Sequence, residues 1–170
     1  MATNMRRMQR IWQVVTTTVT ALLLGTSFAH VLEWPAKLKY EGALYVQLQT
    51  SLYVHWGPPS IGGFIEPAAI LAVFILALLV RKHGSAFRLT LVAGGCLLLA
   101  FPVVFFRRVA PANAAFLHAA TTSILPPDWI AWRTQWETGH ALRFALHGIA
   151  FVLIAVSLTV QGRETRRTQV

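Results

Sequence analysis

Charged residues are scarce in this sequence, and acidic residues are the scarcest. Only 12% of the 170 residues are charged, and 6 Asp and Glu stand against 15 Lys and Arg. A soluble domain usually carries about 25% charged residues. This shortage, with 55% hydrophobic residues and a mean hydropathy of +0.55, excludes an ordinary soluble domain. It indicates an integral membrane protein in contact with the lipid bilayer.

Cysteine is nearly absent as well. Cys96 is the single cysteine, so an intrachain disulfide and a Cys-x-x-Cys metal site are both excluded. Because Cys96 lies inside an apolar run, we expect it to pack as a small hydrophobic residue. A glycine-rich phosphate loop and an HExxH motif are also missing, so we do not expect the phosphate or zinc chemistry of those motifs.

Four apolar runs reach the length of about 20 residues that a membrane-spanning helix needs. They cover residues 11–32, 61–80, 86–106 and 136–160. We therefore predict one all-α domain over residues 1–170, a transmembrane four-helix bundle with short helices in its two outer loops. The first run begins like a signal peptide, but its apolar stretch exceeds the usual signal core of about 7–15 residues, so we expect an uncleaved helix.

The two outer loops carry helical patterns of their own. The first contains a predicted helix over residues 41–56, which Gly57-Pro58-Pro59 ends. The second, residues 107–127, contains another from about 113 to 124. With Asp128 as its N-cap, the last helix is predicted to run unbroken from 129 to 160. Its first turns would then stand above the hydrocarbon layer.

The net charge of +9 comes from short basic clusters that flank the apolar runs. Such flanking clusters set the orientation of membrane proteins, so we expect no nucleic-acid partner. One side collects Arg6, Arg7, Arg10, Arg81, Lys82, Arg88, Arg163, Arg166 and Arg167, and the other has Lys37, Lys39, Arg107, Arg108 and Arg133. We predict a multi-pass protein of the cell membrane with both termini in the cytoplasm.

Two pairs of His and Glu, each spaced by three residues, are predicted at the outer end. His30 and Glu33 close the first helix, Glu137 and His140 open the fourth, and Glu66 enters the second. Residues three apart share a helix face. A Glu-x-x-His pair facing a bundle core is the ligand pattern of di-iron proteins, although one pair is reversed here. The five side chains could bind iron, manganese or zinc, which accept carboxylate and imidazole ligands.

Each of these groups also has an alternative interpretation. The carboxylates of the two pairs could be solvated at the membrane interface, and Arg133 could pair with Glu137 four residues later. Glu66 could be a helix-start carboxylate, which the helix dipole favours. Arg143, one or two turns into the membrane, either snorkels or pairs inward with Glu66, Glu33 or an anionic substrate oxygen.

A haem is a second cofactor hypothesis, because two histidines on different helices can ligate its iron. His30 with either His140 or His147 would supply them. That hypothesis leaves the neighbouring carboxylates unexplained, so we favour a non-haem metal over a haem.

Aromatic residues gather at the same end of the predicted bundle. Five of the six tryptophans fall there, namely Trp34, Trp56, Trp129, Trp132 and Trp136. Most of them are expected to form an interfacial belt. The alternative is a pocket for a flat apolar ligand, and for it we select Trp136, Trp132, His55 and Tyr53 as substrate-binding residues.

Two stretches of the second half resemble the anthrone-oxygenase-like family of small membrane proteins. They are Phe105-Phe106-Arg107-Arg108-Val109-Ala110-Pro111-Ala112-Asn113 and Trp132-Arg133-Thr134-Gln135-Trp136-Glu137-Thr138-Gly139-His140-Ala141-Leu142-Arg143. The resemblance implies four helices. It also implies oxidation of the activated methylene of a polycyclic anthrone to a quinone by dioxygen. Asn113, Trp136, Glu137, His140 and Arg143 sit at the family's motif positions, whereas the first half matches in layout only.

Two functions are therefore open. In the first, a membrane oxidoreductase takes a lipophilic aromatic or quinone-like molecule into a polar pocket at the outer end. His140 or Glu137 removes a proton, Arg143 stabilises the oxyanion, and Asn113 presents its amide to the pocket. In the second, the chain is a non-catalytic accessory or binding subunit, with a membrane-protein partner or a second copy of itself.

Overall fold

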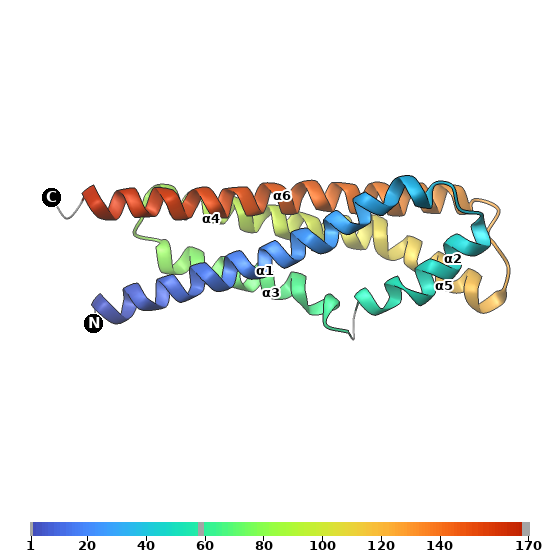
Figure 1. Ribbon diagram of the computed structural model, residues 1–170, viewed down its shortest axis with the longest axis horizontal. Coiled ribbons are helices and arrows are strands. Elements are labelled where there is room, and N and C mark those ends of the chain that lie inside the picture. Colours follow the sequence, from blue (N-terminus) through green and yellow to red (C-terminus); the bar gives the residue numbers. More distant parts are fainter. Residues whose placement is uncertain (1, 58–59, 168–170) are drawn as a thin grey trace.

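The computed structural model describes residues 2–57 and 60–167, without the side chains of residues 2, 3, 55 and 163–167. The described chain is helical (Figure 1). Its elements are α1 (Ala2–Lys37), α2 (Gly42–Ser51), η1 (Tyr53–Trp56), α3 (Gly62–Val80), α4 (Gly84–Leu98), η2 (Leu99–Val109), α5 (Ala110–Thr122) and α6 (Trp129–Arg167). The predicted all-α class is confirmed.

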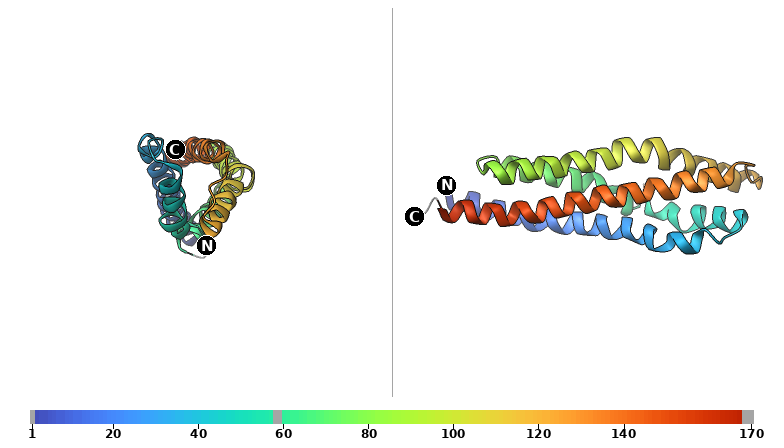
Figure 2. Two further views of the ribbon diagram at one scale, coloured as in Figure 1. Left: turned by 90° about the vertical axis from the view of Figure 1, so that its right-hand side faces the viewer. Right: turned by 90° about the horizontal axis from the view of Figure 1, so that it is seen from above.

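Four helices are apolar and long enough to cross a membrane, and they confirm the predicted number of spans. They cover Asn4–Lys37, Gly62–Val80, Gly84–Thr122 and Trp129–Gly162. Helix α1 packs between α3 and α6, and α4 packs between the same two helices, so the four form a closed bundle (Figure 2).

The third span differs from its prediction. It does not stop at Phe106 before a separate loop helix, because α4, η2 and α5 form one continuous helix over Gly84–Thr122. Arginines at 107 and 108 suggested an end, but charge does not break a helix; it only requires water or headgroups nearby. The central part, η2, is a π-helix that contains Pro102. The helix ends at Ser123, whose φ of 57° is left-handed, as is common after a helix C-terminus.

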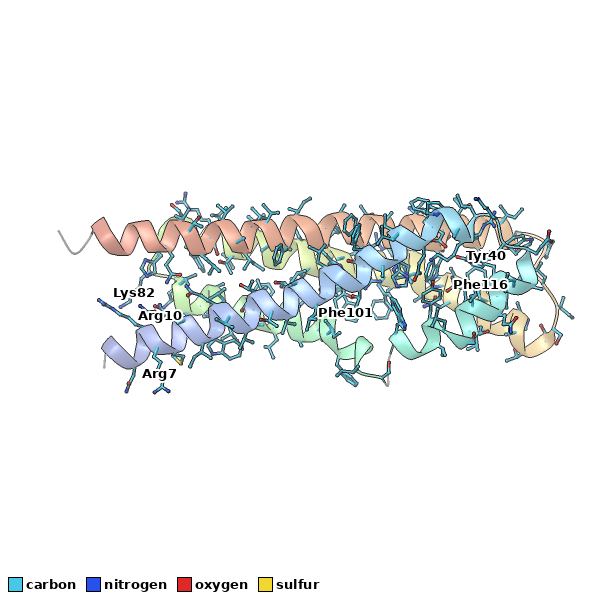
Figure 3. The ribbon with its side chains drawn as sticks, in the orientation of Figure 1. Arg7, Arg10, Tyr40, Lys82, Phe101 and Phe116 are labelled. Atoms are coloured by element: carbon cyan, nitrogen blue, oxygen red, sulfur yellow. The ribbon has the colours of Figure 1, made fainter. Side chains whose placement is uncertain are left out.

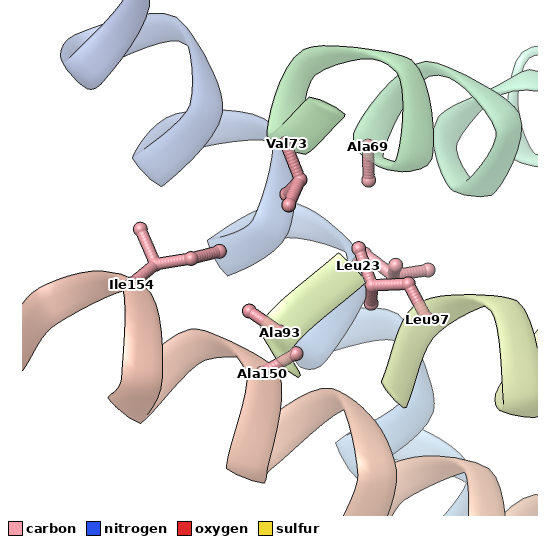
Figure 4. Packing of buried hydrophobic residues seen from close by; sticks show 7 residues of the cluster. All are labelled: Leu23, Ala69, Val73, Ala93, Leu97, Ala150 and Ile154. Atoms are coloured by element: carbon pink, nitrogen blue, oxygen red, sulfur yellow. The ribbon is translucent and has the colours of Figure 1, made fainter. Parts of the chain in front are cut away.

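Small residues hold the middle of the bundle together. Figure 4 shows the buried cluster formed by Leu23, Ala69, Val73, Ala93, Leu97, Ala150 and Ile154. Its three alanines let the helices approach closely, as is typical of helix contacts within membranes. Cys96 packs against this cluster as a small hydrophobic residue, which confirms its predicted role.

Helix α3 is much shorter than its neighbours, and this difference shapes one half of the molecule. Both termini lie at one end of the bundle, with Arg7, Arg10 and Lys82, and Tyr40 lies at the other (Figure 3). We call the end away from the termini the distal end. At the distal end, α2 and η1 lie beyond the end of α3, roughly in line with it (Figure 1). Helix α2 packs against α5. The predicted helix over residues 41–56 is thus found as α2 followed by η1.

Candidate functional site

A cavity of about 650 Å³ lies at the junction between α3 and the α2–η1 segment. Its volume falls within the range of about 300–1,000 Å³ that is usual for small-molecule sites. All four spans and the first loop contribute to its wall. Aromatic side chains supply much of that wall, namely Tyr53, Trp56, Phe101, Phe105, Phe106, Phe116 and Trp136.

The polar part of the wall is centred on Glu66, which is only 4% exposed. Its Oε2 accepts a hydrogen bond from Nη2 of Arg143, and its Oε1 lies 2.8 Å from Nε2 of His147. The other ring nitrogen of His147 lies 3.1 Å from Oγ of Ser27. The predicted inward pairing of Arg143 with Glu66 is therefore confirmed. We call these four residues, Ser27, Glu66, Arg143 and His147, the floor cluster.

Two histidines lie side by side next to the floor cluster, with their rings tilted by 44°. The ring centroids of His30 and His140 are 4.0 Å apart, and both residues line the cavity. Nη1 of Arg143 lies 3.4 Å from Nδ1 of His140, which connects the pair to the floor cluster. Trp136 covers His140 with its ring centroid 4.1 Å away, and it meets His30 edge-on at 5.0 Å. The structure thus brings His30, His140, Arg143 and Trp136 into one site.

A second buried ionic group, the distal group, lies against Trp136, a residue of the cavity wall. Lys37 is only 2% exposed, and its Nζ lies 3.3 Å from Oε1 of Glu137 and 4.4 Å from the centroid of Trp136. Tyr45 donates a 2.9 Å hydrogen bond to the same carboxylate oxygen. Glu137 is 1% exposed and does not line the cavity in the described structure. Its carboxylate contacts Lys37 and Tyr45, and its role as a catalytic base stays a prediction.

Glu33 completes this distal group. It accepts a hydrogen bond from the Tyr53 hydroxyl and lies 3.7 Å from Nζ of Lys37. Burial raises the pKa of Tyr53, and the hydrogen bond to Glu33 raises it further. Burial followed by the charge of Glu137 raises the pKa of Tyr45. Both phenols therefore remain protonated and serve as hydrogen-bond donors.

The predicted five-ligand metal site is not assembled. Within the described residues, no three His, Cys, Asp or Glu side chains are placed to hold one ion. The helix offset explains this: Glu66 meets α6 at His147, about 15 Å along that helix from residue 137 at 1.5 Å per residue. The carboxylates of Glu33, Glu66 and Glu137 each face a cation or a phenol instead of one another.

The haem hypothesis also fails to fit the geometry. The rings of His30 and His140 are packed directly against each other, which leaves no space for a porphyrin between them. His147 is occupied on both ring nitrogens, by Glu66 and Ser27. The donor set therefore suits a site built from protein groups alone, and we derive no step through a metal or haem.

The remaining predicted residues have different outcomes. Asn113 lines the cavity, and its Oδ1 accepts a 2.7 Å hydrogen bond from Nε1 of Trp136, so it orients that ring. Tyr53 lines the cavity as predicted. Trp132 is not among the lining residues; it packs against a buried cluster that includes Tyr45, Phe116 and Trp136. The side chain of His55 lies outside the described residues.

Arg133 does not form its predicted ion pair with Glu137. Its Nη1 donates instead to the backbone carbonyls of Leu38 and Tyr40, at 3.2 and 3.4 Å, and its guanidinium lies over Trp129. It therefore ties the loop that follows α1 to the start of α6.

Sequence reasoning missed three site residues. Lys37 was assigned to an outer loop, although Glu33 lies four residues before it and such a spacing puts both on one helix face. His147 is named from the sequence only as an alternative haem ligand, although its position seven residues after His140 places both on the same face of α6. Ser27 had no signal of its own, since serine in a membrane helix usually bonds its own backbone, as it also does here.

Comparison of the chain with protein-family models, curated proteins and solved structures finds no match. The fold and the site together define a class: a small helical protein with four spans suited to a membrane and an aromatic cavity that contains buried ionisable groups.

Proposed function

We propose that this chain is a membrane oxidoreductase that oxygenates a lipophilic aromatic carbonyl compound, such as an anthrone, in the distal cavity. The observation that carries the proposal is the pair His30 and His140, whose ring centroids lie 4.0 Å apart beside Arg143 in the wall of a largely apolar cavity. An imidazole can remove an acidified C–H proton, and a hydrogen-bond donor beside it stabilises the anion that results. Ionisable groups kept within a membrane bundle usually mark function.

The proposed reaction needs dioxygen as the oxidant. An imidazole takes one proton from the activated methylene, and the carbanion transfers its electron pair to dioxygen as a C–O bond forms. The resulting hydroperoxide loses its second C–H proton while the O–O bond breaks. The carbon is then a ketone, and one oxygen atom leaves as water. The two protons taken from carbon leave in that water, so the histidines are regenerated.

The surroundings of the cavity favour a substrate that arrives through the bilayer. Ile61, Phe106 and Leu117 line it and are 84%, 57% and 56% exposed on the lipid-facing surface of the bundle. Ile61 precedes α3, whereas Phe106 and Leu117 belong to η2 and α5. A flat apolar molecule could enter between these segments and place its oxygen against the histidines.

We expect the purified protein in lipid nanodiscs to consume dioxygen when anthrone is added, and His140→Ala to slow that turnover by roughly 10²–10⁴-fold, the usual contribution of a general acid or base. An oxygen electrode together with the quinone absorbance measures both rates. His118→Ala is the matched control, because His118 is exposed on α5 away from the cavity wall. Unchanged turnover in His140→Ala would remove this residue from the mechanism. Anthrone binding without oxygen uptake would favour the role of a binding subunit.

We further propose that both termini are cytoplasmic in the cell membrane, on the basis of the basic residues at the end that carries the termini. Single cysteines can test this in a Cys96→Ser background. Ile124→Cys, 70% exposed at the distal end, should react with a membrane-impermeant maleimide on intact cells. Met5→Cys, 49% exposed near the N-terminus, should react only after lysis. The reverse pattern would show the opposite orientation.

A further inference from the structure

We propose that the two adjacent histidines have opposite roles: His30 accepts the substrate proton through Nε2, and His140 donates a hydrogen bond to the substrate oxygen through Nε2–H. The assignment of these catalytic roles rests on the proposed function. The proton positions on the two rings follow from contacts in the site and can be tested without any substrate. Arg143 is a positioning residue in this scheme, because it acts through His140.

The proton position on His140 follows from its contact with Arg143. A guanidinium has five N–H donors and no acceptor. Nη1 of Arg143 lies 3.4 Å from Nδ1 of His140, so this ring nitrogen can only accept. A proton on Nδ1 would place two N–H groups against each other. The neutral ring therefore carries its proton on Nε2, where it can polarise a carbonyl oxygen in the cavity.

The floor cluster keeps Arg143 in the position that sets this tautomer. Glu66 accepts a hydrogen bond from Nη2 of the guanidinium, while His147 approaches the other carboxylate oxygen at 2.8 Å. Ser27 lies against the far nitrogen of His147 and so restrains that ring. The contacts run from Ser27 on α1 to His147 on α6, then to Glu66 on α3 and back to Arg143 on α6. They hold the guanidinium with its Nη1 toward His140.

His30 has the opposite arrangement. Its Nδ1 is buried and has no hydrogen-bond partner among the described residues. The ring is packed among Tyr53, Trp56 and Trp136, with centroids 5.0–5.1 Å away. Aromatic faces carry negative charge, so they tolerate an N–H better than a lone pair. This places the proton on Nδ1 and leaves the lone pair on Nε2, the nitrogen that remains for the cavity.

A base and a hydrogen-bond donor side by side define the ligand class. They suit a carbonyl compound whose C–H is acidified by that carbonyl, because the donor stabilises the developing enolate while the base removes the proton. They suit a preformed anion less well, since the charge of Arg143 is already paired with Glu66. We therefore infer that a neutral ketone binds and that it is ionised within the site.

The tautomers can be read directly by nitrogen NMR of histidine-labelled protein in nanodiscs, with His30→Gln and His140→Gln used to assign the signals. We expect an Nε2–H ring for His140 and an Nδ1–H ring for His30. Arg143→Met should shift His140 to a mixture of tautomers and leave His30 unchanged. Arg107→Met, an exposed arginine, is the control and should change neither. A wild-type His140 with its proton on Nδ1, or a His30 with its proton on Nε2, would overturn the assignment.

The roles are tested by hydrogen–deuterium exchange of the anthrone methylene in deuterated buffer without dioxygen, which isolates proton removal from oxygenation. We expect His30→Gln to reduce exchange to the buffer rate while anthrone binding, followed by tryptophan quenching, changes less than about threefold. His140→Gln retains an N–H donor and should retain a measurable part of the exchange. Wild-type exchange in His30→Gln, with loss in His140→Gln, would reverse the roles and overturn the proposal.

Failure of the proposed function would look different. Wild-type protein that neither binds anthrone nor accelerates its exchange would refute the anthrone reaction, and with it the role of His30 as a base. The NMR result would still decide the tautomers, and Arg143→Met would still show whether this residue sets them.

Discussion

Replacing Glu66 with alanine is expected to cost about 3–5 kcal/mol of stability, the loss typical when one partner of a buried ion pair is removed. Glu66 is 4% exposed and is the carboxylate that both Arg143 and His147 contact. Without it, a guanidinium and an imidazole are left facing each other in a bundle with little water to solvate them. Unfolding by SDS in mixed micelles, followed by helical circular dichroism, measures the change in free energy.

Two variants make the Glu66 result specific. Glu66→Gln retains the size and one hydrogen-bond acceptor, so it should lose less stability than Glu66→Ala. Glu41→Ala removes a carboxylate that is exposed and makes no capping hydrogen bond at α2, and it should be close to neutral. A Glu66→Ala protein as stable as Glu41→Ala would show that Arg143 reaches water or headgroups on its own.

Replacing Lys37 with methionine is the second change with a large expected effect. Methionine can fill much of the space beneath Trp136 and Tyr53, but Glu137 then loses its only cation among the described residues within 4 Å. An unpaired carboxylate that is 1% exposed costs about 3–5 kcal/mol by the same reasoning. The SDS unfolding assay again provides the measurement, with the exposed Lys39→Met as control.

The double variant Lys37→Met with Glu137→Gln separates charge from packing. Replacing both partners of a buried pair is often nearly neutral, so the double variant should regain most of the stability that Lys37→Met loses. The effects of substitutions at independent sites add to within about 0.3–0.5 kcal/mol. We expect the interaction energy between Lys37 and Glu137 to be well above that value. Additive losses would mean that Lys37 and Glu137 do not interact, and that Lys37 is held by its aromatic neighbours.

The sequence predicts the local elements well because they depend on local properties. Long apolar runs require helices in a membrane, since every backbone polar group must be bonded internally. The run that became α3 was predicted at residues 61–80 and is found at Gly62–Val80. The predicted third span ends at Phe106, before Arg107 and Arg108, whereas the helix continues to Thr122. That error arose from using charge as a stop signal where backbone hydrogen bonding continues through η2.

For the site, the sequence predicts the candidate residues better than their contacts. The sequence identified His30, His140, Arg143 and Glu66 as unusual polar residues, and one pairing, Arg143 with Glu66, was among those expected. It could not show that Glu66 lies far deeper than Glu137, because that depends on the length and stagger of α3 against α6. The predicted metal site required His30, Glu33, Glu66, Glu137 and His140 at one depth. The stagger instead places Glu66 in the floor cluster and Glu33 and Glu137 in the distal group.

Lys37 illustrates the same limit in a single residue. Two positions beyond it lies Lys39, which is exposed, and composition does not distinguish the two. Lys37 is buried because α1 extends to that residue and directs its side chain toward Glu137 on α6. The sequence alone therefore determined the four apolar helices, the basic end and the set of ionisable residues, through hydropathy and backbone hydrogen bonding. Only the tertiary structure decided which of those residues meet, because the rotation and stagger of packed helices arise from contacts between distant segments.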